Sequence, residues 1–477
     1  MGQQETPVFD GLLNYVRRQG RSFHVPGHKD GRLIPERGRE LYRQLMAIDA
    51  TELPGLDDLY HAQGMLRDGE TLLSHYYGTR ASFFLVNGST VGNLVMIMSS
   101  LHPGDCALVQ RDCHKSVFNG LRLARAEPVF ISPCIDTDSG LSIGLSETEL
   151  EQAVSRFPQA KALILTYPTY YGVAGPLAPL VACAHAHDLL VIVDEAHGPH
   201  FHLGSPLPAD ALNCGADLVV QSAHKMLPAM TMGAWLHVNS DRVKVERIAA
   251  MRAMLQTSSP SYPIMASLDL ARFFLAGFTQ ADLNDAVDSC MRLATAFDRL
   301  EGVHVLKAVS GHFQLDPFKI TLVLERGNGY ALYRRLSALG MYPEMAERSH
   351  VLFTLGVEVQ KHAEAVPLIA RALHEQEEQD SDRAVFSIAF PAVSCLACSY
   401  DELENKRRVI VDFEWAAGQI CAEDIVPYPP GIPLIANGER ISHDSLQMVE
   451  RLLASGASFQ NEHVTNHQLT IYSDGIS

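Results

Sequence analysis

The sequence predicts an α/β fold built on a mostly parallel sheet. Two observations between residues 61 and 275 lead to this prediction: the short continuous apolar runs, and the helical patterns that alternate with them. Such runs are typical of strands that helices cover on both faces. The runs are residues 83–86, 106–110, 162–166, 189–193, 217–221 and 232–238. Because parallel sheets bind ligands beyond the carboxyl ends of their strands, the residues that follow these runs are candidates for a site.

The helical patterns lie between these runs. Helices are expected at residues 91–101, 114–125, 146–156 and 178–188, and a helical connection at 276–300. Pro103 and Gly104 end the first of them, and Ser146 with Glu149 offers a capping box for the third.

The length of 477 residues is too great for one ordinary core, so two or three domains are expected. We predict an N-terminal segment (1–60), a large domain (61–300), a small α/β domain (301–384) and a C-terminal domain (385–477). The N-terminal segment combines an amphipathic helix with a Gly/Pro-rich stretch. The charged stretch at 375–383 is interpreted as a solvated helix end or a linker.

Composition and charge narrow the class of protein. The net charge of −17 disfavours nucleic acid and anionic membranes as partners. The N-terminus lacks the pattern of a signal peptide, and no apolar run is long enough to span a membrane. Nine scattered cysteines favour a reduced, cytoplasmic compartment. Cys395 and Cys398 form a lone CxxC pair without a second pair, so no metal site is expected.

Four polar stretches mark the predicted edge of the sheet. Each has an ordinary explanation as a helix cap or a polar loop. In the first, a glycine turn and two hydroxyls at the start of a helix could cradle an anion. In the third, an aspartate ends a buried strand, where it could bind a metal, a ribose or a protonated ring nitrogen. The stretches are residues 87–90 (NGST), 111–116 (RDCHKS), 193–198 (VDEAHG) and 222–225 (SAHK).

Taken together, the four stretches supply what pyridoxal phosphate needs. These parts are hydroxyls for its phosphate, a flat histidine, an aspartate for the pyridine nitrogen and a lysine for the Schiff base. This combination explains why Lys225 stands between two runs that are predicted to be buried strands. A desolvated ammonium is costly unless it is paired or used chemically.

At this point the sequence resembles a known family. It is similar to the Orn/Lys/Arg decarboxylases, which are fold-type-I, aspartate-aminotransferase-like pyridoxal-phosphate enzymes, and to their shorter bacterial type without the N-terminal wing domain. The resemblance implies a transferase-like large domain with a mostly parallel sheet, plus smaller α+β C-terminal domains. The matching stretches are residues 23–31, 51–64, 87–93, 111–121, 168–173, 193–201, 221–234 and 428–439.

The resemblance implies a role for each site residue. Lys225 would form the Schiff base, Asp194 would pair with the pyridine nitrogen, and His114 would stack on the ring. Ala196 would pack on the other ring face, and His197 would lie near the phenolic oxygen or the substrate carboxylate. The residues that would hold the phosphate are Gly88, Ser89, Thr90, Ser222 and His224.

The expected reaction is decarboxylation of a basic amino acid. The resemblance favours arginine to agmatine, followed by lysine to cadaverine or ornithine to putrescine, in polyamine biosynthesis. Asp57, Asp58 and Glu344 are candidate partners for the cationic side chain, and each could instead be a surface carboxylate or a helix cap. A homodimer or higher homo-oligomer with the active site at the interface is implied. The alternatives are another pyridoxal-phosphate reaction, such as that of an aminotransferase or a lyase, and a non-catalytic regulatory homologue.

Overall fold

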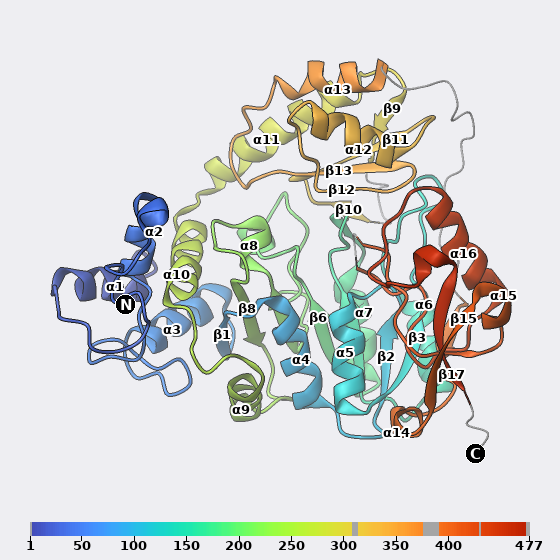
Figure 1. Cartoon of the computed structure of the whole chain (residues 1–477), viewed down its shortest axis with the longest axis horizontal. Coiled ribbons are helices and arrows are strands. Elements are labelled where there is room, and N and C mark those ends of the chain that lie inside the picture. Colours follow the sequence, from blue (N-terminus) through green and yellow to red (C-terminus); the bar gives the residue numbers. More distant parts are fainter. Residues whose placement is uncertain (1, 308–312, 375–390, 429–430, 474–477) are drawn as a thin grey trace. The chain divides into compact units, whose positions relative to one another are not determined.

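The computed structural model describes the chain except residues 1, 308–312, 375–390, 429–430 and 474–477. The charged stretch at 375–383 therefore lies outside the described residues. The chain divides into two compact units (Figure 1). The first contains Met1–Ser100, Ile192–Gly204 and Ala209–Gln280, and the second contains Leu101–Val191, Ser205–Pro208 and Ala281–Ser477. The domain boundaries predicted above stay a prediction.

Strands of the first unit follow the order β1-β8-β7-β6. Their bounds are β1 Ala81–Leu85, β6 Leu190–Asp194, β7 Leu218–Gln221 and β8 Ala234–Val238. The strand β8 runs antiparallel to both β1 and β7, whereas β7 and β6 are parallel. Nearly every residue in these strands is buried, as expected for strands covered on both faces.

Helices of the first unit include α4, which packs against β1, β7 and β8. Short α8 follows β7 and carries Ala223, His224 and Lys225, with Ser222 as its N-cap residue. The bounds are α1 Pro7–Arg17, α2 Glu36–Ala47, α3 Met65–Tyr77, α4 Gly88–Ser100, α8 Ala223–Met226, α9 Val245–Leu255 and α10 Tyr262–Gly277, with the short helix η1 at Phe201–Leu203.

The second unit contains strands in the order β4-β2-β3-β14. The first three are parallel, and β14 pairs antiparallel with β3. Their bounds are β2 Cys106–Gln110, β3 Glu127–Ile131, β4 Ala162–Thr166 and β14 Val393–Cys395. The helices that follow these strands are α5 Lys115–Ala124, α6 Glu147–Arg156 and α7 Leu177–Ala186. A short ladder joins β5 (Val173–Ala174) to β10 (Gln314–Leu315).

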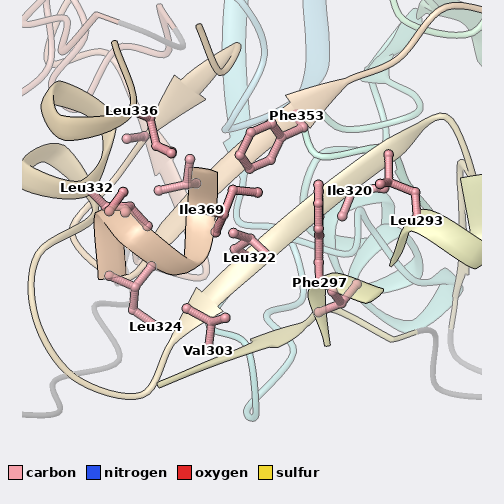
Figure 2. Packing of buried hydrophobic residues seen from close by; sticks show 14 residues of the cluster. Leu293, Phe297, Val303, Ile320, Leu322, Leu324, Leu332, Leu336, Phe353 and Ile369 are labelled. Carbon is pink, nitrogen blue, oxygen red and sulfur yellow. The ribbon is translucent and has the colours of Figure 1, made fainter. Parts of the chain in front are cut away.

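Two small antiparallel sheets complete the second unit. One has the order β12-β13-β11-β9 and packs its apolar face on helices, around Leu322, Phe353 and Ile369 (Figure 2). Its elements are α11 Gln280–Phe297, β9 Val303–Val305, β11 Lys319–Leu324, α12 Gly329–Ala338, β12 Met345–Ala346, β13 His350–Thr354 and α13 Ala365–His374. The other has the order β15-β17-β16. It comprises α14 Tyr400–Glu404, β15 Arg407–Asp412, α15 Phe413–Ala416, β16 Ile420–Cys421, α16 His443–Ala454, η2 Val464–Asn466 and β17 Gln468–Ser473.

The predicted fold class is confirmed: the chain has a mixed α/β fold with a mainly parallel central sheet. The capping box of Ser146 and Glu149 is present at the start of α6. Several helices and strands were not predicted individually, and β3 and α2 are two of them. The strand β3 has an apolar run of only three residues after Glu127 and Pro128, and α2 has no buried residue along its full, described length.

Among the helices that the structure describes, none combines the length and the apolarity needed to cross a membrane.

Gly92 is predicted to be essential for the packing of α4. A Cβ at this position would overlap Val220 Cγ2 and lie 2.8 Å from Leu85 Cδ1. We expect Gly92→Ala to lower the free energy of unfolding by about 1–3 kcal/mol, because packed strands cannot move aside. Urea denaturation measures this. Gly277→Ala at the end of α10 is the control, since a Cβ there meets no described atom within 4 Å. Equal effects of the two substitutions would contradict the prediction.

Candidate active site

The first turn of α4 carries the predicted phosphate residues Gly88, Ser89 and Thr90. The helix begins at Gly88, three residues earlier than predicted, so both hydroxyl residues lie inside its first turn. Ser222, at the end of β7, donates a hydrogen bond from its Oγ to Ser89 Oγ at 2.8 Å. Because the first amides of a helix lack intrahelical partners, this turn with its paired hydroxyls suits an anion.

Asp194 ends β6 and is almost fully buried. Its Oδ2 accepts a hydrogen bond from Asn93 Nδ2 at 2.7 Å, and its Oδ1 accepts from Ala196 N at 3.1 Å. Ala196 is buried as well. These two donors give each oxygen of this buried carboxylate a hydrogen-bond partner in place of water. Asn93 was not given a role from the sequence. A lone amide side chain on the apolar helix 91–98 is the signal that could have indicated it.

Lys225 lies in α8 with its Nζ 3.0 Å from Nε2 of His197. Lys225 is neither fully buried nor exposed in this chain. The reason is local: α8 has four residues and begins directly after the end of β7, at the edge of the sheet. His197 is buried beside it. A histidine nitrogen at this distance can exchange a proton with the amine.

His224 is anchored to the turn that precedes β8. Its Nδ1 donates to the Gly233 carbonyl at 3.0 Å, and its backbone amide donates to the same oxygen at 3.2 Å. Burial lowers the pKa of His224 below its ordinary value, and the neighbouring Lys225 adds to this. The neutral ring with Nδ1–H is therefore favoured.

A buried polar chain crosses the four strands beneath these residues. Ser82 Oγ lies 2.7 Å from His237 Nδ1, and His237 Nε2 lies 3.1 Å from Gln221 Oε1. Gln221 Nε2 donates to Glu195 Oε2 at 2.7 Å, and Ala211 N donates to Glu195 Oε1 at 2.7 Å. Since an amide oxygen only accepts, His237 carries its hydrogen on Nε2 and accepts from Ser82.

Burial shifts the pKa values of two members of this chain. It lowers the pKa of His237 to about 3, and it raises the pKa of Glu195 well above its usual range. Glu195 and Gln221 directly adjoin Asp194 and Ser222 in the sequence, so the chain connects the two strand ends that carry site residues. None of these residues was predicted. Polar residues at the end of, or inside, apolar runs are the signal that could have found them.

His114 belongs to the second unit, where it is the N-cap residue of α5. Its Nδ1 lies 2.8 Å from Ser116 Oγ and accepts a hydrogen bond from Ser116 N at 3.2 Å. The other predicted cofactor residues, from the first turn of α4 and the ends of β6 and β7, gather within the first unit.

The three candidate substrate carboxylates have local partners. Asp57 accepts from the backbone amides of Gln63, Gly64 and Leu66, at 2.7–3.1 Å, and so satisfies the start of α3. Asp58 accepts from Tyr60 N at 2.9 Å. Glu344, in the second unit, accepts from the Tyr170 hydroxyl at 2.5 Å.

These residues fit pyridoxal phosphate. The first turn of α4 and its hydroxyls suit a phosphate, and the buried, doubly hydrogen-bonded Asp194 suits a protonated ring nitrogen. Lys225 is partly buried beside a base, which suits a lysine that reacts with a carbonyl. Among the residues described, no group of three or more His, Cys, Asp or Glu side chains could hold a metal ion.

The fold and this donor set define an enzyme of the pyridoxal-phosphate class. The family model described as "Orn/Lys/Arg decarboxylase, major domain" matches residues 6–356, and the model of the C-terminal domain of the same family matches residues 381–463. The chain belongs to the Orn/Lys/Arg decarboxylase family. It is accordingly a pyridoxal-phosphate-dependent decarboxylase of basic amino acids.

Individual relatives extend over almost the whole chain. The sequence is 42% identical to the uncharacterized protein YaaO of Bacillus subtilis, and the match covers 98% of both chains. It is 32% identical to an arginine decarboxylase of Bacillus anthracis, over 96% of this chain and 95% of that one. The crystal structure of the Francisella novicida lysine decarboxylase LdcF is similar with a TM-score of 0.81 and 18% identity, covering 98% of this chain and 81% of that chain.

The depressed pKa of His237 predicts a loss of stability in acid. Because the folded pKa of about 3 lies below the ordinary value of 6.5, the unfolded chain binds more protons between these two pH values. The contribution of the neutral His237 to the free energy of unfolding is therefore present above pH 6.5 and is lost as the pH falls toward 3. Between pH 7 and pH 5 we expect the parent to lose about 2 kcal/mol more unfolding free energy than His237→Gln.

Urea denaturation at the two pH values measures the difference. His75→Gln, at an exposed position of α3, should behave as the parent does. The same acid sensitivity in His237→Gln and the parent would refute the role of His237.

Proposed function

We propose that this protein decarboxylates L-arginine to agmatine and CO2, with lysine and ornithine as the next candidates. The observation that carries the proposal is the similarity, from end to end, to an arginine decarboxylase at 32% identity. The lysine decarboxylase structure has the same fold at 18% identity, and this chain spans a smaller share of it. The reaction consumes one proton per CO2 released, so the site must deliver a proton to the α-carbon.

Each part of this chemistry has a proposed residue. Lys225 forms the covalent link to the cofactor, and Asp194 keeps a proton on the ring nitrogen. By the family resemblance, His114 would contact the cofactor ring and Ala196 would pack on it. Gly88, Ser89, Thr90, Ser222 and His224 hold the phosphate. The hydrogen bonds of Asn93 to Asp194 and of Ser222 to Ser89 support these assignments.

When bound, pyridoxal phosphate supplies an acceptor for the electron pair that remains after the carboxylate leaves. The negative charge of Asp194, stabilised by Asn93 and Ala196 N, holds the compensating proton in place. Lys225 Nζ is the proton donor to the α-carbon. His197 Nε2, 3.0 Å from Nζ, then restores the proton to the amine.

The substrate cation requires an acceptor carboxylate, and Asp57, Asp58 and Glu344 remain the candidates. Asp57 is occupied by several backbone amides at the start of α3, which leaves it little capacity for a guanidinium. Asp58 and Glu344 each accept one described hydrogen bond at one oxygen. We therefore propose these two before Asp57. A bidentate guanidinium contact would favour arginine over lysine.

The working unit is proposed to be a cytoplasmic homodimer or a larger homo-oligomer. The N-terminal segment supports this, because its large apolar side chains face solvent in the single chain. Phe23 is 92% exposed and Leu41 is 79% exposed. Such side chains close together on one segment are typical of an interface.

Product analysis tests the substrate. Purified protein with pyridoxal phosphate is given arginine, lysine and ornithine in one mixture, and the amines are identified by mass spectrometry while CO2 is measured. We expect agmatine to form in excess over cadaverine and putrescine. Lys225→Ala is the control and should yield no amine above background. Cadaverine or putrescine as the main product would reject arginine as the substrate.

Replacement of Leu41 tests the proposed interface. We expect Leu41→Asp to weaken self-association by about tenfold or more, because a buried leucine contributes roughly 1.5–3 kcal/mol to an interface. Sedimentation velocity over a concentration series measures the change. Met291→Asp, which places the same charge at an exposed position on α11, serves as the control. A parent protein that is monomeric and fully active would contradict the proposal.

A further inference from the structure

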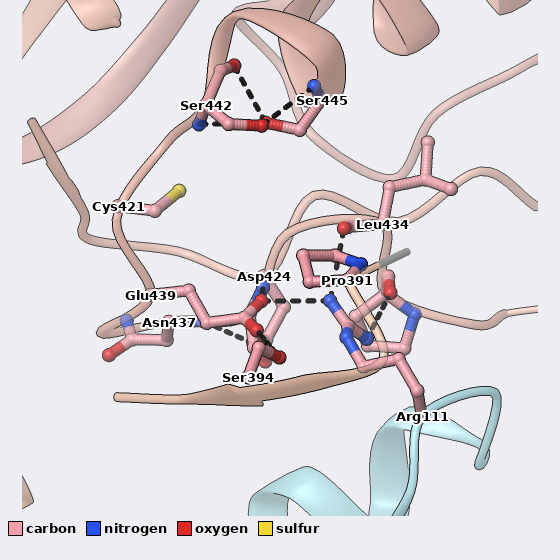
Figure 3. Close-up of polar contacts among 12 residues, drawn as sticks. Arg111, Pro391, Ser394, Cys421, Asp424, Leu434, Asn437, Glu439, Ser442 and Ser445 are labelled. Carbon is pink, nitrogen blue, oxygen red and sulfur yellow. Dashed lines mark hydrogen bonds and ion pairs between the residues drawn. The ribbon is translucent and has the colours of Figure 1, made fainter. Parts of the chain in front are cut away.

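Arg111, three residues before His114, is held by the C-terminal part of the chain (Figure 3). Its guanidinium is buried and donates to the carbonyl oxygens of Pro433 and Leu434 at 2.7 and 3.0 Å. It also forms an ion pair with Glu439 at 2.8 Å. A guanidinium with several fixed acceptors has little freedom to move. The segment between Pro433 and Glu439 is therefore joined to the end of β2.

The carboxylate of Glu439 accepts hydrogen bonds from several groups. Besides Arg111, its carboxylate accepts from Ser394 Oγ and from Ala436 N, both at 2.8 Å. Loss of one partner from such a buried network would leave a charge uncompensated, which costs far more than a surface pair. The network thus connects β14, the loop before α16 and the loop after β2 as one rigid arrangement.

Gly431 lies directly against the imidazole of His114. The backbone amide of Lys115 donates to the Gly431 carbonyl at 3.1 Å. A Cβ on Gly431 would lie 3.3 Å from His114 Cδ2 and 3.4 Å from Nε2. The opposite edge of the same ring, at Nδ1, accepts from Ser116 N at 3.2 Å. The ring is therefore hydrogen-bonded at one edge to α5, and the other edge lies close to the backbone of Gly431.

We propose that residues 431–439 of the C-terminal segment position the His114 imidazole, with Gly431 as the residue that sets the ring's orientation. This inference rests on the proposed contact of His114 with the cofactor ring. It gives the C-terminal domain a part in the chemistry, although none of its residues needs to touch the substrate. Arg111 and Glu439 act through this segment, because they fix the loop on which Gly431 stands.

Gly431 has a matched control elsewhere in the same domain. Its φ is +91°, so any side chain there carries the strain of a left-handed backbone. Gly456 has a φ of +90°, and a Cβ there would meet no described atom within 4 Å. Alanine at the two positions therefore imposes the same backbone strain. Only Gly431→Ala also presses on His114.

The test compares Gly431→Ala with Gly456→Ala as holoenzymes. The circular dichroism of the bound cofactor reports the orientation of its ring and its contacts independently of turnover. We expect Gly431→Ala to change this signal and to lower kcat by about tenfold, with KM less affected, because a small displacement of a positioned group disrupts the reacting geometry. Gly456→Ala should retain the parent's signal and kcat. Identical cofactor spectra in both variants would overturn the proposal.

A second pair of variants provides the test if Gly431→Ala fails to fold. Gly431→Asn and Gly456→Asn carry the same Cβ with less backbone strain, because asparagine tolerates positive φ. The expected contrast is the same. A changed cofactor spectrum in an enzyme that makes no agmatine would support the positioning role while rejecting arginine as substrate. If His114→Ala itself leaves the cofactor spectrum unaltered, the positioning proposal falls, whatever amine is formed.

Discussion

The close approach of α4 to the sheet is the constraint on which the site depends. Gly92 lacks a side chain, so the helix can lie directly on Val220 and Leu85. The next residue, Asn93, then reaches Asp194 at 2.7 Å. A buried carboxylate that lost this donor would bear a cost of about 1–3 kcal/mol or more. The same packing brings the start of the helix to Ser222. Because Gly92 has no side chain, the first turn of α4 can reach Ser222 and Asn93 can reach Asp194.

The polar chain beneath the site shows how such strand ends are kept in register. Ser82, His237, Gln221 and Glu195 come from, or directly follow, β1, β8, β7 and β6, which are neighbours in the sheet. The donors and acceptors of these bonds are defined: Gln221 Oε1 can only accept, so His237 donates to it from Nε2 and accepts from Ser82 at Nδ1. A buried network is favourable only when every member has its partner. Replacement of one member is therefore expected to affect the spacing of Asp194 and Ser222, because Glu195 and Gln221 directly adjoin them in the sequence.

Much of this fold could be predicted from the sequence, because strands covered on both faces must be continuously apolar. That rule located β2 and β4 to the residue, and it failed for β3, where Glu127 and Pro128 leave only three apolar residues. The candidate site residues follow predicted strands, so their positions along the chain could be predicted too. The supporting residues could not. Asn93 and His237 acquire partners through packing of elements that are far apart in sequence, and local patterns do not contain this information.

The surroundings of His114 show this limit most clearly. The sequence around residues 111–116 has the form of an ordinary polar loop before a helix, and the structure indeed makes His114 the cap of α5. What holds the other edge of its ring is a glycine more than three hundred residues later, at Gly431. The contact depends on Arg111 being buried, because a buried guanidinium must collect acceptors, and the carbonyls of Pro433 and Leu434 supply them. The need to satisfy one buried charge therefore determines where the C-terminal segment meets the loop that carries His114, the residue proposed to contact the cofactor. A domain that contributes no reacting group can in this way control the geometry of one that does.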